Sequence, residues 1–304
     1  MRKRPYALAA SLLMLPMRTD AQAPEATFSV QSDLVVLQVT VTDRRGAYVT
    51  DLQRDAFEVF DEGQRRPIQF LADTDTPVTV GLLIDSSGSM LPTRELVIAA
   101  AAAFAEASHP QDEIFALAFN EHVRAALPPS EPFTSDAHRL RAALEQTISA
   151  RGRTALYDAV LAGLEYLSGG SHARRVLVVV SDGGDNASRT TREHVFQKAQ
   201  ASNATIYTLA LRDAAHPSEG DPGLLRELAR ATGGAAFRPE HPPDVGAALR
   251  NIARDIRHTY TIGYVPTQAD RDGSYHRVRV EVESPNGRRL RVRSRSGYVA
   301  GSAR

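Results

Sequence analysis

The chain has 304 residues, of which 42% are hydrophobic and 24% charged, a composition typical of a folded globular protein rather than a disordered one. It contains no cysteine, which excludes disulfides and thiolate metal sites, and only 6% of its residues are aromatic, which argues against a surface that stacks on sugars or bases. Basic and acidic residues are equal in number, at 36 each, so the charge gives no sign of general nucleic-acid binding.

Residues 1–23 have the pattern of a secretory signal peptide. Basic residues at positions 2–4 precede an apolar stretch over 6–15, and residues 21–23 supply the small side chains that a signal peptidase reads. The apolar stretch is shorter than the roughly 20 residues that cross a bilayer. We therefore expect export to the periplasm, the cell surface or the medium, and no transmembrane segment after cleavage. Two prolines argue against the alternative, a buried N-terminal helix.

Residues 24–76 are expected to form a small β segment. Hydrophobic side chains alternate with polar ones over 35–41, which predicts a strand with one buried face. A second strand is expected at 57–60, a hairpin turn at Asp61-Glu62-Gly63, and a third strand at 67–70. So few short strands are too small to be stable alone.

Residues 77–257 alternate strands and helices. Unbroken apolar runs at 78–84 and 176–180 are typical of strands buried on both faces. This alternation predicts an α/β fold with a doubly wound, mostly parallel sheet and helices on both faces. The other elements expected are strands at 113–119, 205–211 and 235–237, and helices at 91–108, 136–148, 155–167, 190–202, 224–231 and 245–256.

Residues 258–304 return to a β pattern, with strands expected at 260–265, 275–283 and 289–295. Because neither terminal segment is large enough alone, we predict that 258–304 packs with 24–76 into one β-sandwich-like unit. Arginines alternate with apolar residues in these strands, and we interpret them as the solvated face of a half-buried sheet. The alternative is a patch that binds lipid phosphate or polysaccharide. The arginines are Arg277, Arg279, Arg289, Arg291, Arg293 and Arg295.

Oxygen-bearing side chains recur where the α/β strands end or a helix begins. Asp85 ends one buried strand, Ser87 and Ser89 follow it in a turn, Thr154 precedes a helix, and Asp182 ends another buried strand. Ligands of doubly wound sheets bind at the carboxyl ends of the strands, so we expect these side chains to converge. Carboxylate and hydroxyl oxygens suit Mg²⁺, Ca²⁺ or Mn²⁺ better than zinc or copper. With few carboxylates, such an ion would have room for an anionic ligand from a partner.

Neighbouring polar residues receive structural interpretations. The side chain of Ser86 is expected to turn away from the ion. Asp158, one helical turn after Thr154, is expected either to support the site from behind or to cap a helix. Asp185 and Asn186 are expected in a loop.

The series Asp85-x-Ser87-x-Ser89, Thr154 and Asp182-Gly183 resembles the metal-ion-dependent adhesion site of von Willebrand factor A-type (VWA) domains, over about residues 78–256. The resemblance implies that the three hydroxyls coordinate the ion directly or nearly so, and that the two aspartates act directly or through water. All five positions are filled. The flanking β segments resemble bacterial "VWFA-related" proteins common in acidobacteria, a family defined mainly by sequence.

These features predict an exported, non-enzymatic protein that mediates binding or adhesion. Its metal would be completed by an exposed Asp or Glu of a protein partner. One alternative is a metal-dependent hydrolase, although Ser87 stands where phosphatase-like sites have a second acid, and no catalytic residue can be named. The other is a metal-free structural component of the cell envelope, in which the same side chains act as helix caps.

Overall fold

The computed structural model describes residues 34–72, 76–211, 220–267, 273–284, 287 and 289–300. The signal peptide expected at 1–23 lies outside the described residues. None of the helices in this described part of the chain is long and apolar enough to cross a membrane.

A six-stranded sheet with the order β10-β9-β8-β5-β6-β7 forms the centre of the α/β region. All its neighbouring strands pair in parallel except β6 and β7. Every residue of β5 is buried, as the unbroken apolar run predicts. The short antiparallel strand β7 was not anticipated from the sequence. The strands are β5 (Val78–Asp85), β6 (Glu113–Phe119), β7 (Val123–Ala125), β8 (Arg174–Ser181), β9 (Thr205–Ala210) and β10 (Ala236–Phe237).

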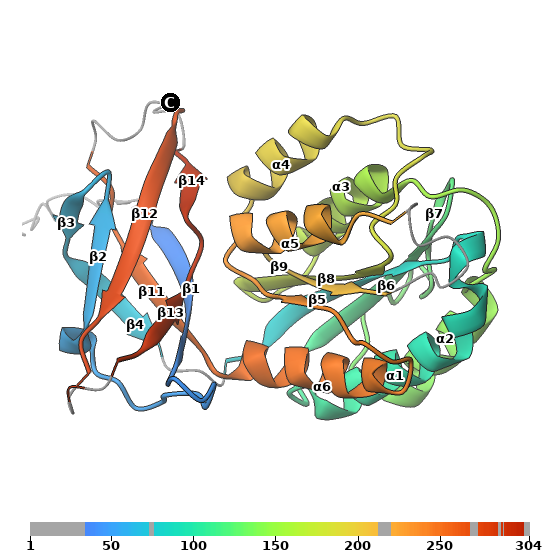
Figure 1. Ribbon diagram of the computed structural model, residues 1–304, viewed down its shortest axis with the longest axis horizontal. Helices are drawn as coiled ribbons and strands as arrows, with labels where there is room; N and C mark the ends of the chain where they lie inside the picture. Colours follow the sequence, from blue (N-terminus) through green and yellow to red (C-terminus); the bar gives the residue numbers. More distant parts are fainter. Residues whose placement is uncertain are drawn as a thin grey trace, which may run out of the picture. The chain divides into compact units, whose positions relative to one another are not determined.

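Helices cover both faces of this sheet (Figure 1). Apolar side chains of α1, α2 and α6 pack on one face, and those of α3, α4 and α5 pack on the other. The predicted α/β fold with a mostly parallel sheet is confirmed. The helices are α1 (Arg94–Ala107), α2 (Ala137–Thr147), α3 (Leu156–Leu167), α4 (Arg192–Ala201), α5 (Pro222–Ala231) and α6 (Asp244–Arg257).

Strands from the two ends of the chain build a second unit, which we call the β unit. Its sheets have the orders β13-β1-β11-β4 and β14-β12-β2-β3, and their facing side chains form one apolar core. Antiparallel pairing of β1 with β11 and of β2 with β12 joins the early and late segments. The strands are β1 (Val35–Thr42), β2 (Phe57–Asp61), β3 (Gln64–Arg66), β4 (Ile68–Ala72), β11 (Thr259–Tyr264), β12 (Tyr275–Val282), β13 (Arg291–Arg293) and β14 (Gly297–Val299).

A fully buried carboxylate, Asp61, ties the two sheets of the β unit together. It accepts hydrogen bonds from Tyr264 Oη at 2.9 Å and Tyr298 Oη at 3.0 Å, and it lies 3.2 Å from His276 Nδ1. Burial, with Tyr298 and Asp61 nearby, raises the pKa of Tyr264, so this hydroxyl stays a donor. The sequence had suggested only a turn at Asp61. A buried network of this kind stabilises only while its acceptor is present.

The interpretation of the alternating arginines as a solvated face is wrong for Arg293 and Arg295. Arg293 forms an ion pair with Asp255 at the end of α6. Arg295 is 5% exposed, and its Nη2 donates to the carbonyl oxygens of Gln200 at 2.9 Å and Ser202 at 2.8 Å. Arg295 lies between β13 and β14, which belong to different sheets, so this segment leaves the sheet surface and contacts the α/β region. Arg293 is the last residue of β13, and its side chain reaches Asp255 of α6.

Asp255 is buried and accepts from residues of both regions. Tyr48 Oη of the β unit donates to it at 3.0 Å, and Tyr207 Oη of β9 donates at 2.7 Å. The carboxylate therefore has three donors, counting Arg293. Desolvation of a charge is tolerated when its hydrogen bonds are so satisfied.

Replacing Asp61 by alanine is expected to lower the free energy of unfolding by about 3 kcal/mol, because the acceptor shared by three buried donors is lost. Urea unfolding followed by circular dichroism measures this change. Glu58→Ala is the control, since Glu58 is partly exposed and its ion pair with Arg65 is worth at most about 1 kcal/mol. An Asp61→Ala protein as stable as the parent would contradict the network's role.

Candidate functional site

The carboxyl end of the central strand presents the first predicted residues. Asp85 is the last residue of β5, and its Oδ1 accepts the backbone N–H of Ser87 at 2.9 Å. This turn leads into a short 3-10 helix, η2 (Gly88–Thr93), which carries Ser89 and runs into α1. Because β8 pairs with β5 in parallel, the end of β8 brings Asp182 to the same edge of the sheet.

The structure brings four of the five predicted residues together. Ser87 Oγ and Ser89 Oγ lie 3.1 Å apart, and Ser89 Oγ donates to Asp182 Oδ2 at 2.9 Å. Asp85 joins the group through its backbone contact with Ser87. We call Asp85, Ser87, Ser89 and Asp182, with Thr154, the metal-site residues. The side chains of Ser87, Ser89 and Asp182 form a chain of oxygen atoms between the ends of two neighbouring strands.

Thr154, the fifth metal-site residue, is held beside them by its backbone. Its N–H donates to Asn186 Oδ1 at 2.8 Å, in the loop that follows Asp182. Two residues earlier, the carbonyl of Gly152 accepts the N–H of Gly88 at 3.1 Å. The Thr154 side chain is 5% exposed and makes no hydrogen bond to the other four residues in the described part of the chain. The loop before α3 is thus fastened to both of the other loops.

Supporting residues fix these loops from behind. Ser86 Oγ accepts the N–H groups of Ser149 and Ala150, so its side chain serves the loop, as expected. Asp158 accepts the N–H groups of Arg189 and Thr190, so it also holds a loop.

Sequence reasoning missed Ser181, whose Oγ donates to Asp85 Oδ2 at 2.7 Å. It is the last residue of β8, directly before Asp182. The available signal was a polar residue closing an otherwise apolar strand next to a predicted ligand. Asn186, expected only in a loop, positions Thr154 in addition.

The site is short of positive charge. Asp85 is 1% exposed and Asp182 is 7% exposed. Burial raises the pKa of Asp85 to about 6; hydrogen bonds from Ser87 and Ser181 oppose this rise, and the charge of Asp182 adds to it. The ionised form of Asp85 is therefore disfavoured mainly by burial, and a cation beside it would offset that cost.

The donor set fits a hard divalent cation. Neighbouring ligands of an octahedral ion at about 2.1 Å lie about 3.0 Å apart. The 2.9 and 3.1 Å oxygen separations here are hydrogen-bond distances and are also compatible with that spacing. Two carboxylates and three hydroxyls suit magnesium, manganese or calcium rather than zinc or copper. Across the described residues, no three His, Cys, Asp or Glu side chains form a group that could hold a metal ion, and the metal-site residues include only two carboxylates.

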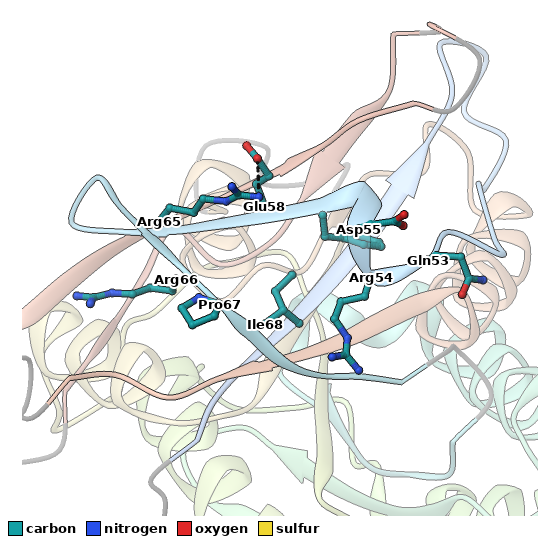
Figure 2. A pocket seen from close by; sticks show the side chains of 9 residues that line it. Gln53, Arg54, Asp55, Glu58, Arg65, Arg66, Pro67 and Ile68 are labelled. Atoms are coloured by element: carbon teal, nitrogen blue, oxygen red, sulfur yellow. Dashed lines mark ion pairs between the residues drawn. The ribbon is translucent and has the colours of Figure 1, made fainter.

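A separate cleft of about 880 Å³ lies in the β unit (Figure 2). Phe57 and Ile68 contribute apolar surface to it, and Arg54 and Arg65 are among its charged residues. Arg65 pairs with Glu58 at 2.9 Å. The cleft contains none of the metal-site residues.

Comparison with known proteins agrees with the fold of the α/β region. Residues 80–184 match the family model of the von Willebrand factor type A domain, a span that includes every metal-site residue. The α/β region therefore contains a VWA domain match over residues 80–184. A search of curated proteins found no similar sequence.

Solved structures share the fold. A von Willebrand factor type A protein from Catenulispora acidiphila aligns with a TM-score of 0.52 and 15% identity, over 82% of this chain and 76% of that one. Proximal thread matrix protein 1 from the mussel byssus aligns with a TM-score of 0.52 and 11% identity, over 65% of this chain and 51% of that one. At such identities the likeness concerns the fold alone.

Without a cation, Asp85→Asn is expected to raise the melting temperature at pH 7.5 by about 5 °C, because ionised Asp85 costs the folded state at most about 3 kcal/mol. The folded-state pKa of about 6 lies above the ordinary 3.8, so this cost grows as pH rises from 4 to 6 and is nearly absent at pH 4. Thermal melts in EDTA at pH 4 and pH 7.5 test whether the rise in melting temperature appears only at the higher pH.

The control is Asp136→Asn at the N-cap of α2, where backbone N–H groups lower the pKa of the carboxyl. The neutral residue is not expected to stabilise there. Equal melting temperatures for Asp85→Asn and the parent in EDTA at pH 7.5 would show that Asp85 carries no such cost.

Proposed function

We propose that this protein is an exported, non-enzymatic binding protein whose VWA domain holds a divalent cation and uses it to bind an acidic side chain of a protein partner. One observation carries the proposal: two hydroxyls and one carboxylate from two strand ends converge at separations that suit neighbouring ligands of one ion, beside the buried carboxylate of Asp85. Export rests on the signal-like pattern of residues 1–23.

The metal-site residues would hold Mg²⁺, Ca²⁺ or Mn²⁺. When bound, the cation supplies positive charge that a partner's carboxylate can neutralise. Asp85 and Asp182 contribute the only two carboxylates, and three hydroxyls contribute no charge. A doubly charged ion with neutral donors among its ligands keeps affinity for a further anion. Ser181 and Asn186 orient the set through Asp85 and Thr154.

The rim of the site also favours an acidic partner. Arg151 and Arg153 are exposed on the loop before Thr154, and the N–H of Arg151 donates to the carbonyl of Ser86 at 2.9 Å. Neither guanidinium has an ion pair with any described residue. Leu91, in η2, is 63% exposed and could contact apolar atoms of the partner. Unpaired positive charge beside a binding site steers anionic ligands toward it.

A hydrolase remains the weaker proposal. A serine nucleophile needs an adjacent base, and among the described contacts no histidine hydrogen-bonds a serine of the site. A metal-free structural role is the other alternative, and it predicts no response to cations.

Thermal melts in EDTA and then in Mg²⁺, Ca²⁺ or Mn²⁺ test the metal site. A cation that binds only the folded state stabilises it by about 2.7 kcal/mol at a hundredfold excess over its Kd. Asp85→Ala and Asp182→Ala are each expected to abolish the shift, whereas Asp136→Asn, outside the site, keeps it. If no cation shifts the melt of the parent protein, the metal-free alternative is favoured.

The arginine rim is tested with a fluorescent oligo-aspartate peptide in the cation that gives the largest shift. Arg151→Gln with Arg153→Gln is expected to slow association about tenfold at low salt, because electrostatic steering is reduced. The cation-dependent melt should be unchanged. Arg226→Gln with Arg230→Gln, on exposed positions of α5, is the charge-matched control. Equal association rates for both double variants would remove the rim from the proposal.

A further inference from the structure

The arginines of the β unit divide into paired and unpaired groups. Arg277 pairs with Glu62, and Arg279 pairs with Glu281 and lies over the ring of Phe60. Arg293 and Arg295 are engaged with the α/β region, as described above. This leaves two exposed members of the alternating series, Arg289 and Arg291. Neither forms an ion pair with a residue that the structure describes.

A cleft of about 510 Å³ collects Arg289 with two further arginines from the other end of the chain. It is lined by Asp43, Arg44 and Arg45, which follow β1, and by Gly287 and Arg289, which precede β13. The pairing of β1 with β13 explains the meeting, since Thr42 stands opposite Arg291 at that end of the sheet.

The turn that carries Arg44 and Arg45 is fixed by Asp43. Asp43 Oδ1 accepts the N–H of Arg45 at 2.8 Å and of Ala47 at 2.9 Å, and Gly46 closes the turn with a φ of +84°. The single carboxylate among the described lining residues is thus engaged with backbone. Arg44 and Arg45 are exposed and have no described ion-pair partner. The lining therefore carries three guanidinium groups against one carboxylate.

We propose that this cleft binds phosphate groups of a polyanion. A guanidinium offers parallel N–H donors that match the oxygens of phosphate, and a phosphate group has enough oxygens and charge to engage more than one arginine. No aromatic or large apolar side chain is among the described lining residues, so stacking and apolar docking have no surface here. The cleft shares no residue with the metal site and does not rest on the function proposed for that site.

The test uses the full protein in EDTA, so that the metal site takes no part. Two probes present the same chemistry from different sources: soluble polyphosphate, and phosphatidylcholine vesicles with or without phosphatidylglycerol. The parent is expected to bind at least one probe in a salt-dependent way. The cleft variant Arg44→Gln/Arg45→Gln/Arg289→Gln is expected to bind it roughly tenfold to a hundredfold more weakly.

The matched control is Arg65→Gln/Arg277→Gln/Arg279→Gln, which removes the same charge from the same unit. Each of these arginines is paired with a carboxylate, as Figure 2 shows for Arg65 and Glu58. The control should keep the parent's affinity. Melts check folding, and Arg289→Gln alone, outside the Asp43 turn, repeats the test if the triple cleft variant unfolds.

Loss confined to the cleft variant supports the proposal. Binding to polyphosphate then indicates a soluble polyanion, and binding only to phosphatidylglycerol vesicles indicates a lipid headgroup. Equal loss in both triple variants would show that only net charge matters and would overturn the proposal. Failure of the parent to bind either probe would overturn it as well. Neither result bears on the cation-dependent melt, so the two proposals fail separately.

Discussion

The burial of β5 on both faces is the constraint on which the candidate site depends. Every residue from Val78 to Asp85 is buried, so polar side chains can collect only where the strand ends. From β5 the chain proceeds to β6 on one side and later to β8 on the other. Loops that leave the sheet at such a point diverge and open a crevice for ligands. Asp85 stands at this point, and the parallel pairing of β8 brings Asp182 beside it.

The same burial lowers the stability of the folded state when Asp85 is ionised and no ligand is bound. Asp85 is held in a place that raises its pKa to about 6, and hydrogen bonds from Ser87 and Ser181 offset only part of that cost. Groups that a fold retains against its own stability are candidates for function, because a ligand can supply the missing stabilisation. A cation between two buried carboxylates is the ligand that this chemistry favours.

The sequence predicted the sheet and the convergence of four candidate site residues, because both follow from patterns along single strands. Apolar runs at β5 and β8 marked the buried strands, and Asp85, Ser87, Ser89 and Asp182 converge at their ends as expected. The contacts that the sequence did not predict depend on which other elements a strand packs against. The alternation of arginines with apolar residues predicted which arginines share a face. It did not show that β13 and β14 belong to different sheets. Likewise, Asp61 looks like a turn residue in the sequence until its hydrogen bond to Tyr264 of the opposite sheet is known.

The arginines of the β unit fall into groups that differ in whether their charge contributes to folding or is left for a ligand. A buried guanidinium such as that of Arg293 must have acceptors, because desolvation without them is costly. Exposed arginines paired with carboxylates, such as Arg277, contribute little to folding, and their charge is neutralised by a carboxylate of the same chain. Arg44, Arg45 and Arg289 belong to neither group, since they are solvated and gathered in one cleft. These three arginines form no ion pair within the described fold. We therefore propose that their charge binds a ligand, by the same reasoning as for the metal site.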